Sequence, residues 1–218
     1  MNLLKRLLGK QSVDDEPIAS QQESFEWWRR AVGEGTGVTP HLLSACDELP
    51  GSSGPFGESA DSPIPVNGPD GEVIYLNQLR CKNGCGFLWH RIGSSTTAGP
   101  SKNLDIYELV ALDASEWRRL YFSMHHPRRS TLTPAGLHLR SWKSLSDIER
   151  VFAKCTGFGS TSYVENFPFG MPDAAARDDQ LNSISPGVGA SVAKRVQDTL
   201  RQSEGKWSRP PNFPPSST

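Results

Sequence analysis

The chain has 218 residues, 36% of them hydrophobic, and its 23 basic and 24 acidic side chains give a formal net charge of −1. That length suits one domain with tails, and the near-neutral charge argues against a globally basic nucleic-acid binder. The 20 glycines and 17 prolines indicate that part of the chain is loop or tail, so the core must be concentrated elsewhere.

The first 22 residues are expected to form a flexible segment with a short amphipathic helix. Four leucines share one helical face there, and a Lys-Arg pair splits them into runs of two: Leu3, Leu4, Leu7 and Leu8. The helix either caps the body or frays, or else it binds a membrane surface or a partner. Apolar runs this short are too brief for a signal peptide or a transmembrane helix, so we expect a soluble, cytoplasmic protein.

Residues 23–204 are expected to form a single α+β domain. Phe25, Trp28 and Val32 share a helical face between Ser24 and Val32. A loop rich in glycine and proline follows over residues 50–71. Later elements are a β-meander over about residues 72–142, helices over about 145–155 and 188–203, and a proline-rich disordered tail over 205–218.

The predicted meander has four to five antiparallel strands with flanking helices. Runs rich in aliphatic and aromatic residues alternate with short turns, and connections this short permit only antiparallel neighbours. The predicted strands cover residues 72–81, 85–92, 104–112 and 117–124, with a short fifth strand over 137–142.

The turn Lys82-Asn83-Gly84 is expected to join the first two strands as a hairpin. A three-residue loop with Gly84 in the left-handed conformation places Cys81 opposite Cys85 and Tyr75 opposite Arg91. A two-residue loop would instead set the apolar residues of one strand beside polar residues of the other, because a one-residue slip exchanges the faces of a strand. We therefore prefer the three-residue loop.

Cys81 and Cys85 are weak candidates for a metal site. Metal knuckles commonly space two cysteines two residues apart, whereas this pair has three residues between them, and no second ligand pair is evident. The favoured interpretation is that both are reduced, buried thiols on the inner side of the hairpin, with a cross-strand disulfide as an alternative. We expect no metal and no cofactor.

Glu108 lies on the same strand face as Ile106 and Val110. An ionised carboxylate in that environment must find a partner or shift its pKa. The candidate partners are His90, Arg91, His126, Arg128 and Arg129. Glu108 is then either a structural ion pair or a general acid/base, with His90 and His126 as the other catalytic candidates.

Two segments leave predicted strands with imidazole and guanidinium groups followed by hydroxyls. They are His90-Arg91-Ile92-Gly93-Ser94 and His126-Pro127-Arg128-Arg129-Ser130. Arginine forks match the geometry of phosphate and carboxylate groups. If these ends meet, Arg91, Ser94, Arg128, Arg129 and Ser130 would form an anion-binding surface; the alternative is solvated arginines beside histidines that cap strand ends.

These segments, together with Ser62-Pro-Ile-Pro-Val-Asn-Gly68 and Tyr75-Leu76, resemble a family of small bacterial proteins described only as hypothetical. The resemblance covers about residues 56–137. It implies a bacterial cytosolic setting and no known activity, so no catalytic roles follow from it.

Three functional hypotheses result. The first is a non-catalytic binding or interaction module that holds a protein or a small anionic ligand at the basic strand ends. The second is a small enzyme that uses Glu108 and a histidine as acid and base on a phosphate- or carboxylate-bearing substrate, with arginines as charge clamps. The third, a nucleic-acid binder, is disfavoured by the charge. The sequence leaves the oligomeric state open.

Overall fold

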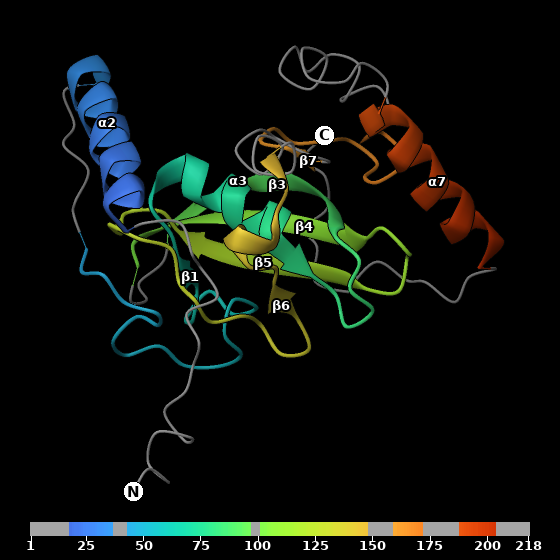
Figure 1. Ribbon diagram of the computed structural model, residues 1–218, viewed down its shortest axis with the longest axis horizontal. Coiled ribbons are helices and arrows are strands. Elements are labelled where there is room, and N and C mark those ends of the chain that lie inside the picture. Colours follow the sequence, from blue (N-terminus) through green and yellow to red (C-terminus); the bar gives the residue numbers. More distant parts are fainter. Residues whose placement is uncertain (1–17, 37–42, 97–100, 148–158, 172–187, 204–218) are drawn as a thin grey trace, which may run out of the picture.

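A five-stranded mixed sheet forms the centre of the protein in the computed structural model, which describes residues 18–36, 43–96, 101–147, 159–171 and 188–203 (Figure 1). The strand order is β1-β5-β4-β3-β7. Its three long strands are β3 (Phe87–Thr96), β4 (Asn103–Ala111) and β5 (Trp117–Ser123), which pair antiparallel in sequence order. This part of the predicted meander is confirmed, and the fold class is α+β.

Both edges of the sheet differ from the prediction. The two-residue strands β1 (Ile64–Pro65) and β7 (Gly159–Ser160) pair parallel to β5 and β3. The expectation of a purely antiparallel meander is therefore wrong. Two residues carry no periodicity that a pattern could reveal, and Pro65 is tolerated there because β1 is an edge strand.

The strand expected over residues 72–81 is a helix, α3 (Gly68–Gln78), followed by the short strand β2 (Leu79–Arg80). Eight of the eleven helical residues are buried, so the helix has almost no polar face. Its apolar run therefore resembles a buried strand. β2 pairs antiparallel with β6 (His138–Leu139) in a separate two-stranded sheet.

The predicted turn at residues 82–84 does form. The backbone N–H of Cys81 donates to the carbonyl of Cys85 at 2.8 Å, and Gly84 has a φ of 82°. That conformation is the left-handed one that glycine adopts without strain. Because α3 replaces the strand before it, however, Tyr75 does not pair with Arg91, which lies opposite Tyr107 instead.

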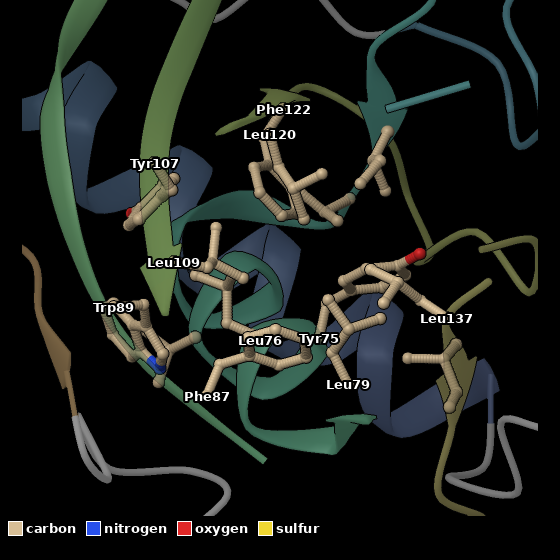
Figure 2. Close-up of a cluster of buried hydrophobic side chains, with 14 of the residues drawn as sticks. Tyr75, Leu76, Leu79, Phe87, Trp89, Tyr107, Leu109, Leu120, Phe122 and Leu137 are labelled. Carbon is tan, nitrogen blue, oxygen red and sulfur yellow. The ribbon is translucent and has the colours of Figure 1, made fainter. Parts of the chain in front are cut away.

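Two hydrophobic clusters cover the two faces of the sheet. The larger cluster joins α3 to inward-facing residues of β3, β4 and β5; Figure 2 shows Tyr75 of α3 on the side of the cluster near Leu79 and Leu137, with Trp89 and Tyr107 on the other side. The second joins Leu88 and Val110 to the segment 164–171 and to α7 (Val188–Gln202). Strand alternation therefore sends neighbouring residues of β4 to opposite layers.

The remaining described helices are α2 (Ile18–Thr36), which lies beside α3 (Figure 1), and a 3₁₀ helix at Trp142–Ser144. α2 begins earlier than the predicted Ser24, and α7 confirms the predicted last helix. The amphipathic segment before residue 18, most of the helix expected over 145–155 and the proline-rich tail lie outside the described residues. No helix in the described part is long and apolar enough to cross a membrane.

Candidate functional site

Glu108 and His90 form a buried pair on the α7 side of the sheet. They lie opposite each other on β4 and β3, His90 Nε2 is 2.9 Å from Glu108 Oε2, and neither side chain is exposed. Trp117 Nε1 donates to the other carboxylate oxygen, Oε1, at 2.6 Å. The partner that the sequence required for Glu108 is thus His90, one of the candidates.

The tautomer of His90 follows from its second ring nitrogen. The backbone N–H of Val164 donates to Nδ1 at 3.0 Å, so Nδ1 is the acceptor and Nε2 carries the proton that is donated to Glu108. The ring also stacks on Phe167, with centroids 4.2 Å apart. Both nitrogens are engaged and the ring is enclosed, which is the arrangement of a structural polar network.

A second polar cluster lies on the α3 face of the same two strands. Arg91 Nη2 donates to both Asp105 and Ser94, and Ser94 Oγ donates to Asp105 at 2.8 Å. The Asp105 side chain is 4% exposed and that of Arg91 is 33% exposed. We call Arg91, Ser94 and Asp105 the arginine corner.

A β-bulge builds the arginine corner. Arg91 pairs with Tyr107 and Ser94 pairs with Asp105, so Ile92 is an extra residue on β3. In a regular strand Arg91 and Ser94 would face opposite sides, because they are three positions apart. The inserted residue brings both to the side of Asp105, which fits the common use of bulges to redirect side chains.

Glu72 of α3 closes the arginine corner from the protein interior. It is 1% exposed, and Tyr107 donates its hydroxyl hydrogen to Glu72 Oε2 at 2.8 Å. Burial, followed by the nearby charge of Asp105, raises the pKa of Glu72 well above its usual value. Burial of Glu72 therefore favours its protonated form. For Arg91, burial works against the charged form, but the bond and charge of Asp105 outweigh it and raise its pKa.

His126 lies in a different polar network near the end of β5. Its Nε2 is 3.0 Å from Ser123 Oγ, which is 2.8 Å from Ser101 Oγ, and its Nδ1 is 2.9 Å from the carbonyl of Ser44. His126, Ser123 and Ser101 are all buried. Burial lowers the pKa of His126, so the ring is neutral at pH 7 and acts as a buried connector.

Arg128, Arg129 and Ser130 hold other segments in place. Arg128 Nη1 donates to Asp47 at 2.9 Å, and Ser130 Oγ donates to the carbonyl of Asp47 at 2.6 Å. Arg129 is 2% exposed; its backbone N–H donates to Gln21 Oε1 and its Nη1 donates to Asn67 Oδ1. Two of the five predicted anion-binding residues, Arg129 and Ser130, are thus buried.

Burial alone would raise the pKa of Asp47. Hydrogen bonds from Arg128 and from the backbone and hydroxyl of Thr131 outweigh it and lower the pKa. Asp47 therefore stays ionised and ties residues 43–49 to the chain after β5.

The sequence indicated that both His/Arg segments lie at strand ends. The structure shows that the first of them does not. β3 continues to Thr96, so His90 and Arg91 sit in mid-strand. His90 faces the α7 layer, whereas Arg129 bonds to Asn67 at the start of α3. The convergence of Glu108, a histidine and these arginines that the enzyme hypothesis requires is met only by His90 and Glu108.

Three residues of this region escaped the sequence analysis as site candidates: Glu72, Asp105 and Tyr107. Asp105 and Tyr107 alternate with Glu108 on β4, so period two does place them together on the other face. Glu72 was hidden because residues 72–81 were expected to be a strand, which separates it from the elements that it contacts.

Cys81 and Cys85 lie at the opposite end of the sheet from the arginine corner. Their thiols form no disulfide, and the Asp113 carboxylate, in the turn between β4 and β5, lies close to both of them. Burial raises the pKa of the Cys85 thiol, and Asp113 adds to that effect.

No family model, curated protein or solved structure matches this chain. The resemblance drawn from the sequence motifs therefore stays an expectation, and the function is argued from geometry alone.

Proposed function

We propose that this chain is a non-catalytic binding module that holds an anionic group, a phosphate or a carboxylate, at the arginine corner. The observation that carries the proposal is the state of Arg91. Its side chain is one-third exposed, and among the described residues only its Nη2 donates to a protein group. Nε is buried without a hydrogen-bond partner there, which leaves Nη1 as the donor that faces solvent.

Ser94 Oγ accepts from Nη2 and donates to Asp105, so it helps to fix the guanidinium in place. A guanidinium matches the geometry of phosphate or carboxylate oxygens. Asp105 fixes the orientation of Arg91. Because Asp105 is nearly buried, it contacts the guanidinium from the protein interior and leaves the solvent side to a ligand. A preorientated arginine loses less side-chain entropy on binding.

The raised pKa of Glu72 is consistent with the same proposal. If Glu72 and Asp105 were both ionised, two carboxylates would oppose one guanidinium and an anion would be repelled. Burial raises the pKa of Glu72 and so favours its neutral form, which limits the negative charge at the arginine corner. Binding should therefore weaken when the pH is raised far enough to ionise Glu72.

The acid/base candidates support a binding role over a catalytic one. A general acid or base must come within hydrogen-bond reach of its substrate. His90 and Glu108 have no exposed side-chain surface, and the ring of His126 is buried against Ser123 and the Ser44 carbonyl.

The test is a titration of the full ¹⁵N-labelled chain with inorganic phosphate and, separately, with a short poly-aspartate peptide. Backbone amide shifts should change around Ser94 and Asp105. They should be lost in Arg91→Ala and reduced in Arg91→Lys, which keeps the charge but not the fork. Arg201→Ala, which removes an exposed arginine of α7, is the matched control.

Shifts that persist unchanged in a folded Arg91→Ala protein would overturn the proposal. So would an absence of localised shifts at low ionic strength with both probes, because screening is weakest there.

A further inference from the structure

We propose that Cys81, Cys85 and Asp113 form a binding site for a thiophilic divalent cation such as Zn²⁺, with one coordination position left open. The three ligand atoms, two sulfurs and one carboxylate oxygen, all lie within 4.8 Å of one another. The sequence offered only the two cysteines and no further ligand. The third comes from a turn that is distant in sequence, and only the fold brings it near.

The backbone holds the two thiols together. The N–H of Cys81 donates to the carbonyl of Cys85, the N–H of Gly84 donates to the carbonyl of Cys81, and both distances are 2.8 Å. The left-handed φ of Gly84 closes this loop. A tetrahedral Zn²⁺ with bonds of about 2.3 Å to sulfur needs ligand atoms roughly 3.7 Å apart. Side-chain rotations that move the ligand atoms by about 1 Å or less would therefore bring them to the distances that zinc requires.

Asp113 is orientated for coordination by neighbouring donors. Ser115 donates to Oδ1 from its backbone N–H at 3.0 Å and from its hydroxyl at 2.6 Å, and Asn83 Nδ2 donates to Oδ2 at 3.0 Å. An ionised carboxylate offers about four acceptor positions; these bonds use three, and the Cys85 thiol donates to the carboxylate as well. A bound metal would take the place of that thiol hydrogen, held by the kind of outer contacts that orient metal ligands.

The donor set decides the class of metal. Two thiolates and one carboxylate favour Zn²⁺ or Cd²⁺ over Mg²⁺ and Ca²⁺, which prefer all-oxygen sites. Cys81 is buried, while Cys85 and Asp113 are partly exposed, so a cation can enter from solvent. Three protein ligands leave the fourth tetrahedral position to water or to a ligand from a partner.

The site is separate from the arginine corner. Leu112, next to Asp113, bonds through its N–H to the carbonyl of Gly86 at the start of β3, whereas Ser94 and Asp105 lie seven or more residues further along the strand pair. The failure of one proposal therefore leaves the other intact.

The experiment uses the full chain with Cys46→Ser and Cys155→Ser, purified reduced and stripped with EDTA, so that only Cys81 and Cys85 carry thiols. Titration with Co²⁺ should give one equivalent of binding, a sulfur-to-cobalt charge-transfer band and the strong visible absorption of tetrahedral cobalt. Zn²⁺ should displace the cobalt and bleach both bands.

Cys85→Ser should reduce the charge-transfer band by about half and weaken Zn²⁺ binding at least tenfold, and Asp113→Asn should weaken binding at least tenfold with the band retained. Asp198→Asn is the control, because it changes a partly exposed acid of α7 that pairs with Arg201 and should leave binding unchanged. Both test positions are partly exposed, so these variants should fold.

Three results would overturn the proposal. The first is the absence of a charge-transfer band in the reduced protein. The second is binding that survives Cys85→Ser and Asp113→Asn unchanged. The third is a Cys81–Cys85 disulfide, found by mass spectrometry in freshly isolated protein, whose reduction restores no metal binding.

Discussion

Replacing Glu108 with glutamine keeps the size of a fully buried side chain and removes its charge. The carboxylate accepts hydrogen bonds from Trp117 Nε1 and His90 Nε2 at 2.6 and 2.9 Å. The two donors point at different carboxylate oxygens, and a glutamine amide has oxygen at only one of these positions, so its NH₂ group would face the other N–H. His90 cannot relieve this by moving its proton to Nδ1, because that nitrogen accepts from Val164.

The expected loss can be estimated from these contacts. A hydrogen bond to a charged group contributes about 1.5–3 kcal/mol, and leaving a buried donor unsatisfied costs about 1–3 kcal/mol. Glu108→Gln should therefore lower the free energy of unfolding by about 3–5 kcal/mol, the range seen when one partner of a buried pair is removed. For a domain of this size that corresponds to a fall in Tm of roughly 6–20 °C.

Urea unfolding followed by tryptophan fluorescence measures the effect, with Glu26→Gln as the matched control. Glu26 pairs with Arg29 on α2 but is 40% exposed, so its replacement should change stability by less than about 0.5 kcal/mol. Trp117→Phe, which removes a single donor, should give an intermediate loss and remains measurable if Glu108→Gln is too unstable. A loss for Glu108→Gln no larger than that of Glu26→Gln would refute the reasoning.

Two further substitutions test the packing and the protonation of the other face. In Gly159→Ala the new Cβ would lie 2.0 Å from the Trp89 ring, so thermal unfolding should show that the free energy of unfolding falls by about 1–3 kcal/mol. Gly93→Ala is the control, because a Cβ there meets open space and should change the free energy of unfolding little. The pKa of Glu72 is raised well above its usual 4.5 in the native state, so its contribution to stability is full below pH 4.5 and declines as the pH rises toward its native pKa. Glu72→Gln should remove that decline, which is at most about 1.4 kcal/mol per pH unit; an unchanged difference between the two proteins from pH 5 to 8 would contradict it.

The sequence predicts the long strands well. The expected segments 85–92, 104–112 and 117–124 correspond to β3, β4 and β5 within a few residues. Helix α7 was equally legible, since its apolar residues recur at helical spacing. In α7 one face is buried and the other is not, so the helical period appears directly in the sequence. β3 and β4 are buried on both faces along much of their length, and their runs of aliphatic and aromatic residues between short turns were the signal that revealed them.

α3 was missed because it lacks that contrast. Val73, Ile74, Tyr75 and Leu76 are consecutive and all buried, and an apolar run of this length does not distinguish a buried helix from a buried strand. A helix signal was nevertheless present, because Pro69 falls in the first turn and Asp70 follows it. Local start signals should have outweighed the β-branched composition here.

The candidate site was predictable in its residues but not in its arrangement. A carboxylate on an apolar strand face requires a partner, and His90 was among those proposed for Glu108. Which residues share a side of β3 beyond Arg91 depends on the bulge at Ile92, and strand alternation alone gives the wrong side for Ser94. The contribution of Glu72 depends on α3, and that of Asp113 on a contact between two turns.

Strand β4 gives both faces of the sheet a buried acid, and the two acids solve the problem of burial differently. Glu108 is satisfied by two N–H donors, Trp117 Nε1 and His90 Nε2, and neither Glu108 nor His90 has exposed side-chain surface. Asp105 pairs with an arginine that reaches the surface, and burial raises the pKa of Glu72 behind it. Only the second solution leaves a charged donor exposed to a ligand. Since His90 and Glu108 have no exposed side-chain surface, the proposed anion site lies on the other face of β4, at the arginine corner, where the bulge at Ile92 turns Ser94 toward Asp105.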